Sequence, residues 1–173
     1  VTLQDPDGID RPSLRLVLNG QLYTTDSGAL SLEEFSSTDG GTDGGVSADY
    51  QRADVVLVGV SRSGKTPTCI YMAMQYGVFA ANYPFTEDDF DGKQLPASVR
   101  GHTPKLFGLT ISPLRLQQIR NERRPGSRYA SISQCEFEVR SAENLFHRHG
   151  IPSIDTTECS IEEIASRVID DAV

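Results

Sequence analysis

The distribution of apolar residues along the chain indicates short buried strands separated by helices. Residues Ala53–Val58 form a continuous apolar run with β-branched side chains, which is typical of a strand covered on both faces of a parallel sheet. Later runs of similar character predict further short strands at Val78–Asn82, Lys105–Ile111 and Ile151–Asp155. Because strands that alternate with helices usually form a parallel sheet, the pattern predicts an α/β fold with ligand groups at the carboxyl ends of the strands.

Capping signals mark where the intervening helices begin and end. Ser112 is the N-cap of a predicted helix whose first residue is Pro113, since proline's missing N–H is not needed there. Gly150 ends a longer amphipathic helix, and Ser160 forms a capping box with Glu163 at the start of the last one. The predicted helices cover about residues 66–76, 112–123, 133–149 and the segment after Ser160.

The N-terminal part of the chain has a different pattern. Leu14–Leu18 and Gln21–Thr25, joined through Asn19-Gly20, predict a β-hairpin, because Asn-Gly readily adopts a type I′ turn. Ser36–Ser47 has the glycine-rich, polar composition of a flexible linker. We therefore expect residues 1–46 to form an N-terminal extension and linker, and residues 47–173 to form one α/β domain.

Composition and charge exclude several classes of protein. The chain has 173 residues and a formal net charge of −8, which argues against general nucleic-acid binding because phosphate neutralisation needs a basic surface. No apolar run approaches the roughly 20 residues that span a bilayer, and the first residues lack a signal-peptide pattern. We expect a cytoplasmic protein with no membrane segment. Cys69, Cys135 and Cys159 are widely separated, which favours reduced thiols over a disulfide or a metal site.

Five arginines lie close together in the sequence with Glu122 as the one acid among them. They are Arg115, Arg120, Arg123, Arg124 and Arg128. Such a cluster could form a patch that receives an anion or an acidic partner, or it could be the solvated face of a helix. The sequence leaves both alternatives open.

A complete Gly-x-x-x-x-Gly-Lys-Thr motif follows the first predicted strand and leads into a predicted helix. Glycines allow the backbone N–H groups to turn toward one anion, and the helix N-terminus adds a positive dipole end. We expect Lys65 to contact the outer phosphates of a nucleotide and the Thr66 hydroxyl to bind Mg²⁺. A chance glycine-rich turn is the alternative. The predicted nucleotide-binding residues are Gly59, Val60, Ser61, Arg62, Ser63, Gly64, Lys65 and Thr66.

An acidic partner for Mg²⁺ is less evident. The strand Lys105–Ile111 carries no aspartate at its end, where many nucleotide-binding enzymes place one. Asp155, Asp54 and Asp43 are the candidates; Asp155 ends a predicted strand, whereas Asp43 lies in the glycine-rich linker, where a solvated turn residue is the simpler reading.

Several stretches together resemble the C-terminal half of the phosphoenolpyruvate synthase regulatory proteins, a family that includes plant regulators of pyruvate,phosphate dikinase. The similarity runs from about residue 53 to the end of the chain. The stretches are Ala53–Thr68, Ala80–Phe85, Lys105–Ser112, Ile119–Ser131 and Ser160–Ala165.

The resemblance implies a bifunctional enzyme that acts on a protein. It implies ADP-dependent phosphorylation of a threonine on the dikinase, which inactivates it, and phosphate-dependent removal of that group as pyrophosphate, which restores activity. ADP would be the phosphoryl donor, Mg²⁺ the metal, and phosphoenolpyruvate synthase and inorganic phosphate the other partners. Gly59–Thr66 would bind ADP, and Lys65 and Arg62 would stabilise the transferring group.

The chain also departs from the family pattern. The family usually has a His-Asp-Asp-Gly stretch before the first strand, and here Thr42–Gly45 is its nearest equivalent, with shifted spacing. Asp43 is therefore the candidate catalytic acid or base, and Lys65 is the other candidate catalytic residue. Two alternatives stay open: a nucleotide-binding remnant without transfer activity, and another P-loop enzyme that phosphorylates a small molecule. A homodimer is an open alternative for the assembly.

Overall fold

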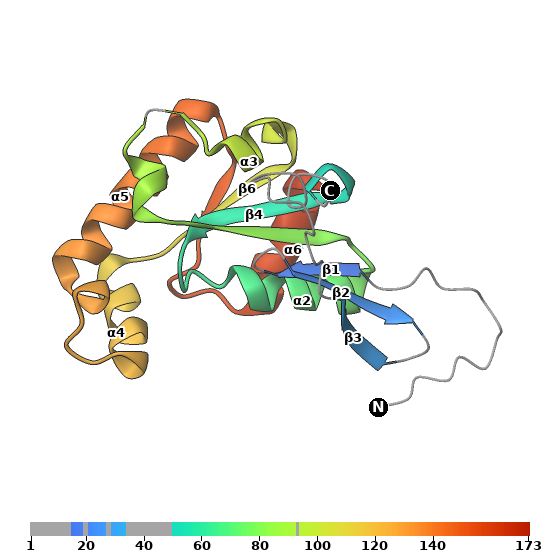
Figure 1. Ribbon diagram of the computed structural model, residues 1–173, viewed down its shortest axis with the longest axis horizontal. Helices are drawn as coiled ribbons and strands as arrows, with labels where there is room; N and C mark the ends of the chain where they lie inside the picture. Colours follow the sequence, from blue (N-terminus) through green and yellow to red (C-terminus); the bar gives the residue numbers. More distant parts are fainter. Residues whose placement is uncertain (1–14, 19–20, 27–28, 34–49, 93) are drawn as a thin grey trace.

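The computed structural model describes residues 15–18, 21–26, 29–33, 50–92 and 94–173, and in this part of the chain one mixed sheet is flanked by helices (Figure 1). The strands are β1 (Arg15–Leu18), β2 (Gln21–Asp26), β3 (Ala29–Glu33), β4 (Val55–Val60), β5 (Ala80–Phe85), β6 (Leu106–Thr110) and β7 (Ser153–Asp155). The helices are α2 (Lys65–Tyr76), α3 (Ala97–Arg100), α4 (Pro113–Arg123), α5 (Ile132–His149) and α6 (Ile161–Ala172). Short 3-10 helices are η1 (Glu87–Phe90), η2 (Thr103–Lys105) and η3 (Arg128–Ala130).

Strands β5, β4, β6 and β7 are parallel and adjacent in that order, which confirms the predicted α/β class. The chain passes from β4 to its neighbour β5 on one side, and then to β6 on the other side of β4. Numbered from β4, this is the order 2-1-3-4 that occurs in doubly wound sheets. The carboxyl end of β4 is therefore the point where the direction of winding reverses.

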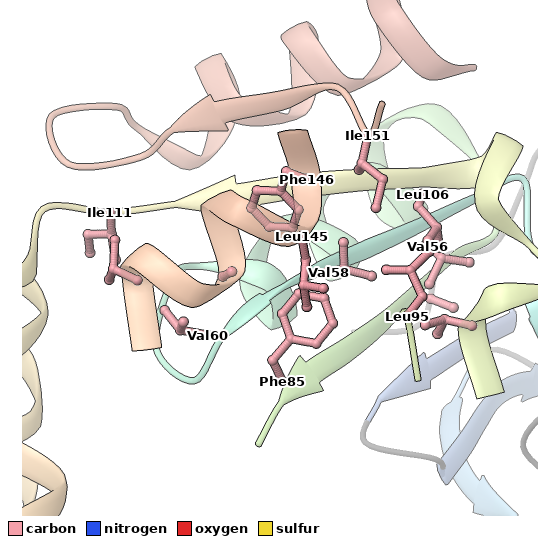
Figure 2. Close-up of a cluster of buried hydrophobic side chains, with 14 of the residues drawn as sticks. Val56, Val58, Val60, Phe85, Leu95, Leu106, Ile111, Leu145, Phe146 and Ile151 are labelled. Carbon is pink, nitrogen blue, oxygen red and sulfur yellow. The ribbon is translucent and has the colours of Figure 1, made fainter. Parts of the chain in front are cut away.

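Successive side chains of β4 point to opposite faces of the sheet and contribute to two separate layers of the core. Val56, Val58 and Val60 face a cluster that includes α5, whereas Val55 and Leu57 face a cluster built from α2 and α6. Figure 2 shows the first cluster, in which side chains from α5 pack onto the sheet beside those of β4 and β6. Successive side chains of a strand point to opposite faces, so a strand buried on both sides is apolar throughout.

The predicted N-terminal hairpin is present. β1 and β2 are antiparallel, with Leu18 opposite Gln21, and β3 continues the meander. β1 also pairs in parallel with β5 at Val17 and Ala81, so these strands extend the sheet at its β5 edge. The linker Ser36–Ser47 lies outside the described residues, and the division into residues 1–46 and 47–173 stays a prediction.

Element boundaries differ modestly from the sequence prediction. β4 begins two residues later than expected and ends at Val60, because its ladder with β5 continues to the pair Val60 and Phe85. The predicted loop residues Gly59 and Val60 are therefore strand residues. The helix signals are confirmed: Pro113 begins α4, Gly150 ends α5, and Ser160 forms a capping box with Glu163.

Candidate functional site

The predicted phosphate loop connects the carboxyl end of β4 to the first turn of α2. β4 lies between β5 and β6, so the loop sits at the reversal point of the sheet. Ligands of open α/β sheets bind in the crevice at such a point, because the loops from neighbouring strands diverge there. The fold thus places the motif where a parallel sheet offers a binding site.

The loop backbone adopts a conformation that requires glycine at its start. A β-carbon at Gly59 would lie 2.3 Å from the carbonyl oxygen of Leu109 in β6, which excludes every larger residue unless the strands separate. Gly64 and Arg62 have φ angles of 91° and 77°, in the left-handed region. The N-terminus of α2 has neither a side-chain cap nor an acidic residue in its first turn. Its first backbone N–H groups lack intrahelical acceptors and are suited to an anion.

Lys65 folds back into the loop. Its Nζ donates to the carbonyl oxygen of Val60 at 2.6 Å and to Ser63 Oγ at 3.4 Å. The side chain is only 4% exposed, and burial lowers the pKa of Lys65 to about 7. A buried ammonium at a helix N-terminus, held by one carbonyl and one hydroxyl, is poorly stabilised by its surroundings. An anion in the loop would supply the missing counter-charge.

The fit of the site to Mg²⁺ depends on Thr66, the predicted ligand. The Thr66 hydroxyl accepts a hydrogen bond from Asn82 Nδ2 at 3.1 Å, which fixes its position next to the middle of β5. Mg²⁺ usually keeps several waters and takes few protein ligands, so one hydroxyl together with phosphate oxygens suits it. Among the described residues no group of three or more His, Cys, Asp or Glu side chains could hold a metal ion.

The two candidate aspartates that the structure describes, Asp54 and Asp155, each bind a backbone N–H outside the loop. Asp54 precedes β4 at the opposite end of the sheet, where its Oδ2 accepts from the backbone N–H of Phe79 at 2.8 Å. Asp155 ends β7, and its Oδ1 accepts from the backbone N–H of Thr157 at 2.9 Å. Asp54 is therefore unsuited to Mg²⁺ in the loop, Asp155 caps a turn, and Asp43 lies outside the described residues.

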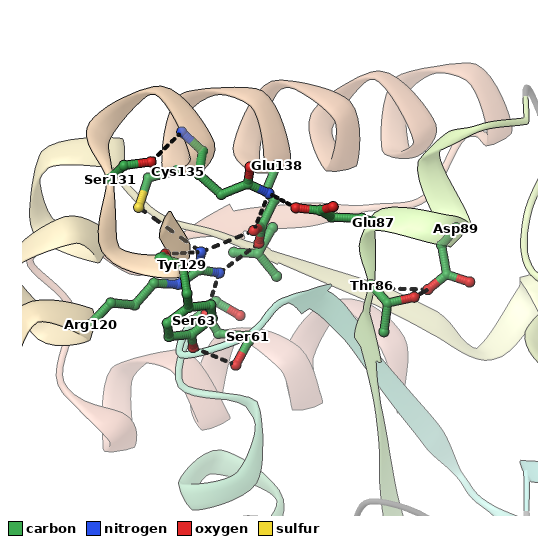
Figure 3. A network of polar contacts seen from close by, with 12 residues as sticks. Ser61, Ser63, Thr86, Glu87, Asp89, Arg120, Tyr129, Ser131, Cys135 and Glu138 are labelled. Atoms are coloured by element: carbon green, nitrogen blue, oxygen red, sulfur yellow. Dashed lines mark hydrogen bonds and ion pairs between the residues drawn. The ribbon is translucent and has the colours of Figure 1, made fainter. Parts of the chain in front are cut away.

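A buried arginine on α4 supports the loop from the α5 side (Figure 3). Arg120 Nη2 donates to the carbonyl oxygen of Ser61 at 3.2 Å and to Glu138 Oε2 at 2.6 Å, and Nη1 donates to Glu138 Oε1 at 3.0 Å. Its guanidinium carbon lies 4.0 Å from the centroid of the Tyr129 ring, and the Tyr129 hydroxyl is 2.9 Å from Ser61 Oγ. The bidentate ion pair and the stacked ring hold this side of the loop in place.

This network corrects the prediction of a five-arginine patch. Arg120 is fully buried, because α4 packs on α5 and brings Glu138 to its guanidinium. Arg128 is exposed but pairs with Glu87 at 3.0 Å, an acid 41 positions earlier in the sequence. Arg115, Arg123 and Arg124 are the exposed members of the cluster, and none of them forms an ion pair with a described acid.

Further contacts to the loop were not predicted from the sequence. Thr156, just after β7, donates through Oγ1 to the carbonyl oxygens of Ser63 at 3.2 Å and Thr110 at 2.9 Å. Arg120 and Tyr129 both lie in Ile119–Ser131, one of the stretches that carry the family resemblance, so the resemblance marked their segment without revealing their roles.

Neither the cysteines nor the apolar character of the described helices indicates a further site. All three cysteines are free thiols, and burial raises the pKa of Cys69 to about 12, which keeps this thiol protonated next to Lys65. In the described ranges, no helix combines the length and apolar character that crossing a membrane demands.

The geometry defines an α/β protein in which the central parallel strand leads through a glycine-containing loop into an uncapped helix. Residues 36–169 match the model of the kinase/pyrophosphorylase family, and the chain belongs to this family. The chain is similar to a Pseudomonas fluorescens (strain Pf0-1) protein provisionally named phosphoenolpyruvate synthase regulatory protein, with 61% identity over 127 residues that cover 73% of the chain and 47% of the relative.

Proteins with the same provisional name in two further organisms give equivalent matches. The Ectopseudomonas mendocina (strain ymp) protein is 61% identical and the Stutzerimonas stutzeri (strain A1501) protein 60% identical, again over 73% of the chain and 47% of each relative. The chain thus spans about half the length of the curated relatives it matches.

Proposed function

We propose that the protein regulates phosphoenolpyruvate synthase by reversible phosphorylation of a threonine on that enzyme. In the inactivating direction ADP is the donor, and in the activating direction inorganic phosphate removes the phosphoryl group as pyrophosphate. The single observation that carries the proposal is the buried Nζ of Lys65, which lies 2.6 Å from the Val60 carbonyl oxygen at the N-terminus of α2, in a chain of the kinase/pyrophosphorylase family. We further propose that the protein acts in the cytoplasm.

The two reactions need the same phosphate-binding groups. In the forward reaction the threonine oxygen forms a bond to the β-phosphorus of ADP, the bond from that phosphorus to the bridging oxygen breaks, and AMP leaves with the bridging oxygen. The hydroxyl proton passes to a base, for which Asp43 is the candidate. In the other direction an oxygen of inorganic phosphate attacks the phosphothreonine phosphorus, and pyrophosphate and the threonine hydroxyl are formed.

Residues of the loop have distinct parts in this chemistry. The N–H groups at the start of α2 bind the phosphate oxygens, and Lys65 neutralises charge on the transferring group. Mg²⁺, when bound through Thr66, supplies further charge neutralisation between the phosphates. Arg120 holds the Ser61 carbonyl and so keeps the loop open for the ligand. Arg62 is an exposed residue of the loop, and its guanidinium can approach the transferring group.

The decisive experiment is a transfer assay. Purified protein is incubated with phosphoenolpyruvate synthase in its phosphohistidine form, ADP and Mg²⁺, and the synthase is analysed for phosphothreonine and residual activity. The proposal predicts a phosphothreonine that appears with loss of synthase activity and is removed by inorganic phosphate with release of pyrophosphate. Absence of phosphothreonine together with tight ADP binding would instead favour nucleotide binding without transfer.

A further inference from the structure

A cavity of about 430 Å³ lies at the carboxyl ends of β6 and β7, between α5 and the start of α4. Its volume falls within the range of small-molecule sites, which is roughly 300–1,000 Å³. Residues from the β6–α4 segment, from α5 and from the end of β7 surround it. They are Ile111, Ser112, Pro113, Glu136, Val139, Arg140, Glu143 and Asp155.

The cavity is close to the phosphate loop along the edge of the sheet. Thr110, at the end of β6, pairs with Asp155 at the end of β7, and β6 is the direct neighbour of β4. Since adjacent strands are about 4.8 Å apart, the end of β7 lies about 10 Å from the end of β4. Thr156 Oγ1 connects the two places through its bonds to Ser63 and Thr110. A nucleotide bound by its phosphates in the loop can reach this distance with its ribose and base.

The opposite side of the loop is filled by protein. Glu87, the first residue of η1, accepts from Gln134 Nε2, and Gln134 Nε2 also donates to Glu138 Oε1 at 2.9 Å. Glu138 in turn holds Arg120, which contacts the loop at Ser61. This continuous chain of hydrogen bonds occupies the space between β5 and α5, so the part of a ligand beyond its phosphates has room toward β6 and β7.

The charges of the cavity select against phosphate. Three carboxylates, from Glu136, Glu143 and Asp155, outnumber the one guanidinium of Arg140. Carboxylates repel phosphate oxygens but accept hydrogen bonds from ribose hydroxyls, a contact that nucleotide-binding α/β proteins use. Glu143 is already oriented, because Thr110 Oγ1 donates to its Oε1 at 2.7 Å. Ile111 and Val139 are only 5% and 4% exposed, whereas the half-buried Pro113 offers an apolar surface for a base.

We propose that this cavity binds the nucleoside portion, the ribose and base, of the nucleotide whose phosphates occupy the loop. This inference rests on the proposed function, since it takes the loop as the phosphate site. The loop binds the charged end of the ligand, and the cavity binds its neutral end. Nucleotides are then held more tightly than pyrophosphate, and the acceptor protein approaches the loop from solvent.

Two ligands that share the diphosphate separate the loop from the cavity. Binding of ADP and of pyrophosphate, each with Mg²⁺, is measured by titration calorimetry for the unaltered protein and for Ser112→Phe, which fills the cavity with a ring. Ser112 makes no side-chain cap to α4, so the change leaves the helix start intact. Ser166→Phe on the exposed side of α6 is the matched control. We expect a loss of at least tenfold in ADP affinity for Ser112→Phe, with pyrophosphate affinity within twofold and the control unchanged.

A second variant tests the ribose contact directly. In the unaltered protein 2′,3′-dideoxy-ADP should bind several-fold more weakly than ADP, and Glu143→Gln should reduce that difference, because the two changes remove the same interaction. Glu162→Gln on α6 is the control. Unchanged ADP affinity in both cavity variants, or equal losses for ADP and pyrophosphate, would overturn the nucleoside site while leaving the loop intact. Failure of the unaltered protein to bind either ligand would contradict the proposed function itself.

Discussion

The Arg120 guanidinium donates to the Ser61 carbonyl oxygen at 3.2 Å while Glu138 holds the same guanidinium through two hydrogen bonds of 2.6 and 3.0 Å. One side chain therefore connects the phosphate loop to α5. Arg120 is fully buried, so its charge requires Glu138, and the loop position depends on a pair of residues 18 positions apart. The contribution of Arg120 to the stability of the fold can therefore be measured separately from its contribution to ligand binding.

Arg120→Met alone should lower the free energy of unfolding by about 3–5 kcal/mol, because it leaves the Glu138 carboxylate buried without its partner. The double variant Arg120→Met with Glu138→Met should recover most of that loss, since paired apolar replacements of a buried ion pair are often neutral. Urea denaturation measures both. ADP affinity should stay about tenfold weaker in the double variant, because the contact to Ser61 is still missing. Recovery of ADP affinity together with stability would show that Arg120 has no part in positioning the loop.

The lowered pKa of Lys65, about 7, predicts a pH dependence of phosphate binding. A bound anion favours the ammonium, so the pKa of Lys65 is higher in the complex than in the free protein. The contribution of Lys65 to the affinity for phosphate ligands is then fully present below pH 7. It falls as the pH rises above 7, by at most tenfold for each pH unit.

The comparison that isolates this effect is Lys65→Arg, whose guanidinium does not titrate in this range. Pyrophosphate affinity is measured for both proteins, and the affinity of the unaltered protein is divided by that of Lys65→Arg. This ratio should decrease between pH 7 and pH 9. The ionisation of pyrophosphate itself affects both proteins equally and cancels in the ratio. A ratio that stays constant across this range would contradict a neutral Lys65 in the free protein.

Arg123 and Arg124 are exposed at the end of α4 and, of the three exposed arginines of the cluster, are the adjacent pair that we propose for a surface that binds the protein substrate. Replacing both with glutamine should raise the apparent KM for phosphoenolpyruvate synthase severalfold and flatten its dependence on salt, with ADP affinity nearly unchanged. The matched control replaces Arg52 and Arg167, which are exposed elsewhere. Equal kinetics and salt response in the two double variants would identify the pair as an ordinary solvated surface.

A chain that begins near Val46 should keep the fold from β4 to α6, since these elements contain the parallel strands and both layers of the core. We expect a cooperative thermal transition that ADP shifts upward, because a ligand that binds the native state stabilises it. This truncation removes β1, which pairs with β5 at Val17 and Ala81 and also contacts α2. Loss of the transition would show that the N-terminal strands are part of the domain.

The parts of the fold that local chemistry determines were predictable from the sequence. The apolar run at β4, proline at the start of α4, and the capping box of Ser160 with Glu163 each depend on residues within a few positions of one another. The loop was found because its motif is contiguous. Its residues run from the end of β4 into the first turn of α2, in the strand–loop–helix order that the sequence predicts.

The supporting contacts could not be predicted in the same way, because they join residues that are distant in the sequence. Five clustered arginines look alike, and only the packing of α4 on α5 decides that Arg120 turns inward to Glu138. The contact of Tyr129 with Ser61 spans 68 positions, and that of Thr156 with Ser63 spans 93. The extension of β4 to Val60 likewise depends on its backbone pairing with β5 and not on the local strand propensity of its residues.

The most direct test of the account is the affinity of the Lys65→Ala protein for ADP, measured by titration calorimetry with Mg²⁺ beside the unaltered protein. Removal of the ammonium takes away the cation that faces the outer phosphate, so we predict a loss of at least tenfold in ADP affinity with a thermal transition that stays cooperative. An affinity for ADP equal to that of the unaltered protein would contradict the claim that Gly59–Thr66 binds the phosphates of a nucleotide.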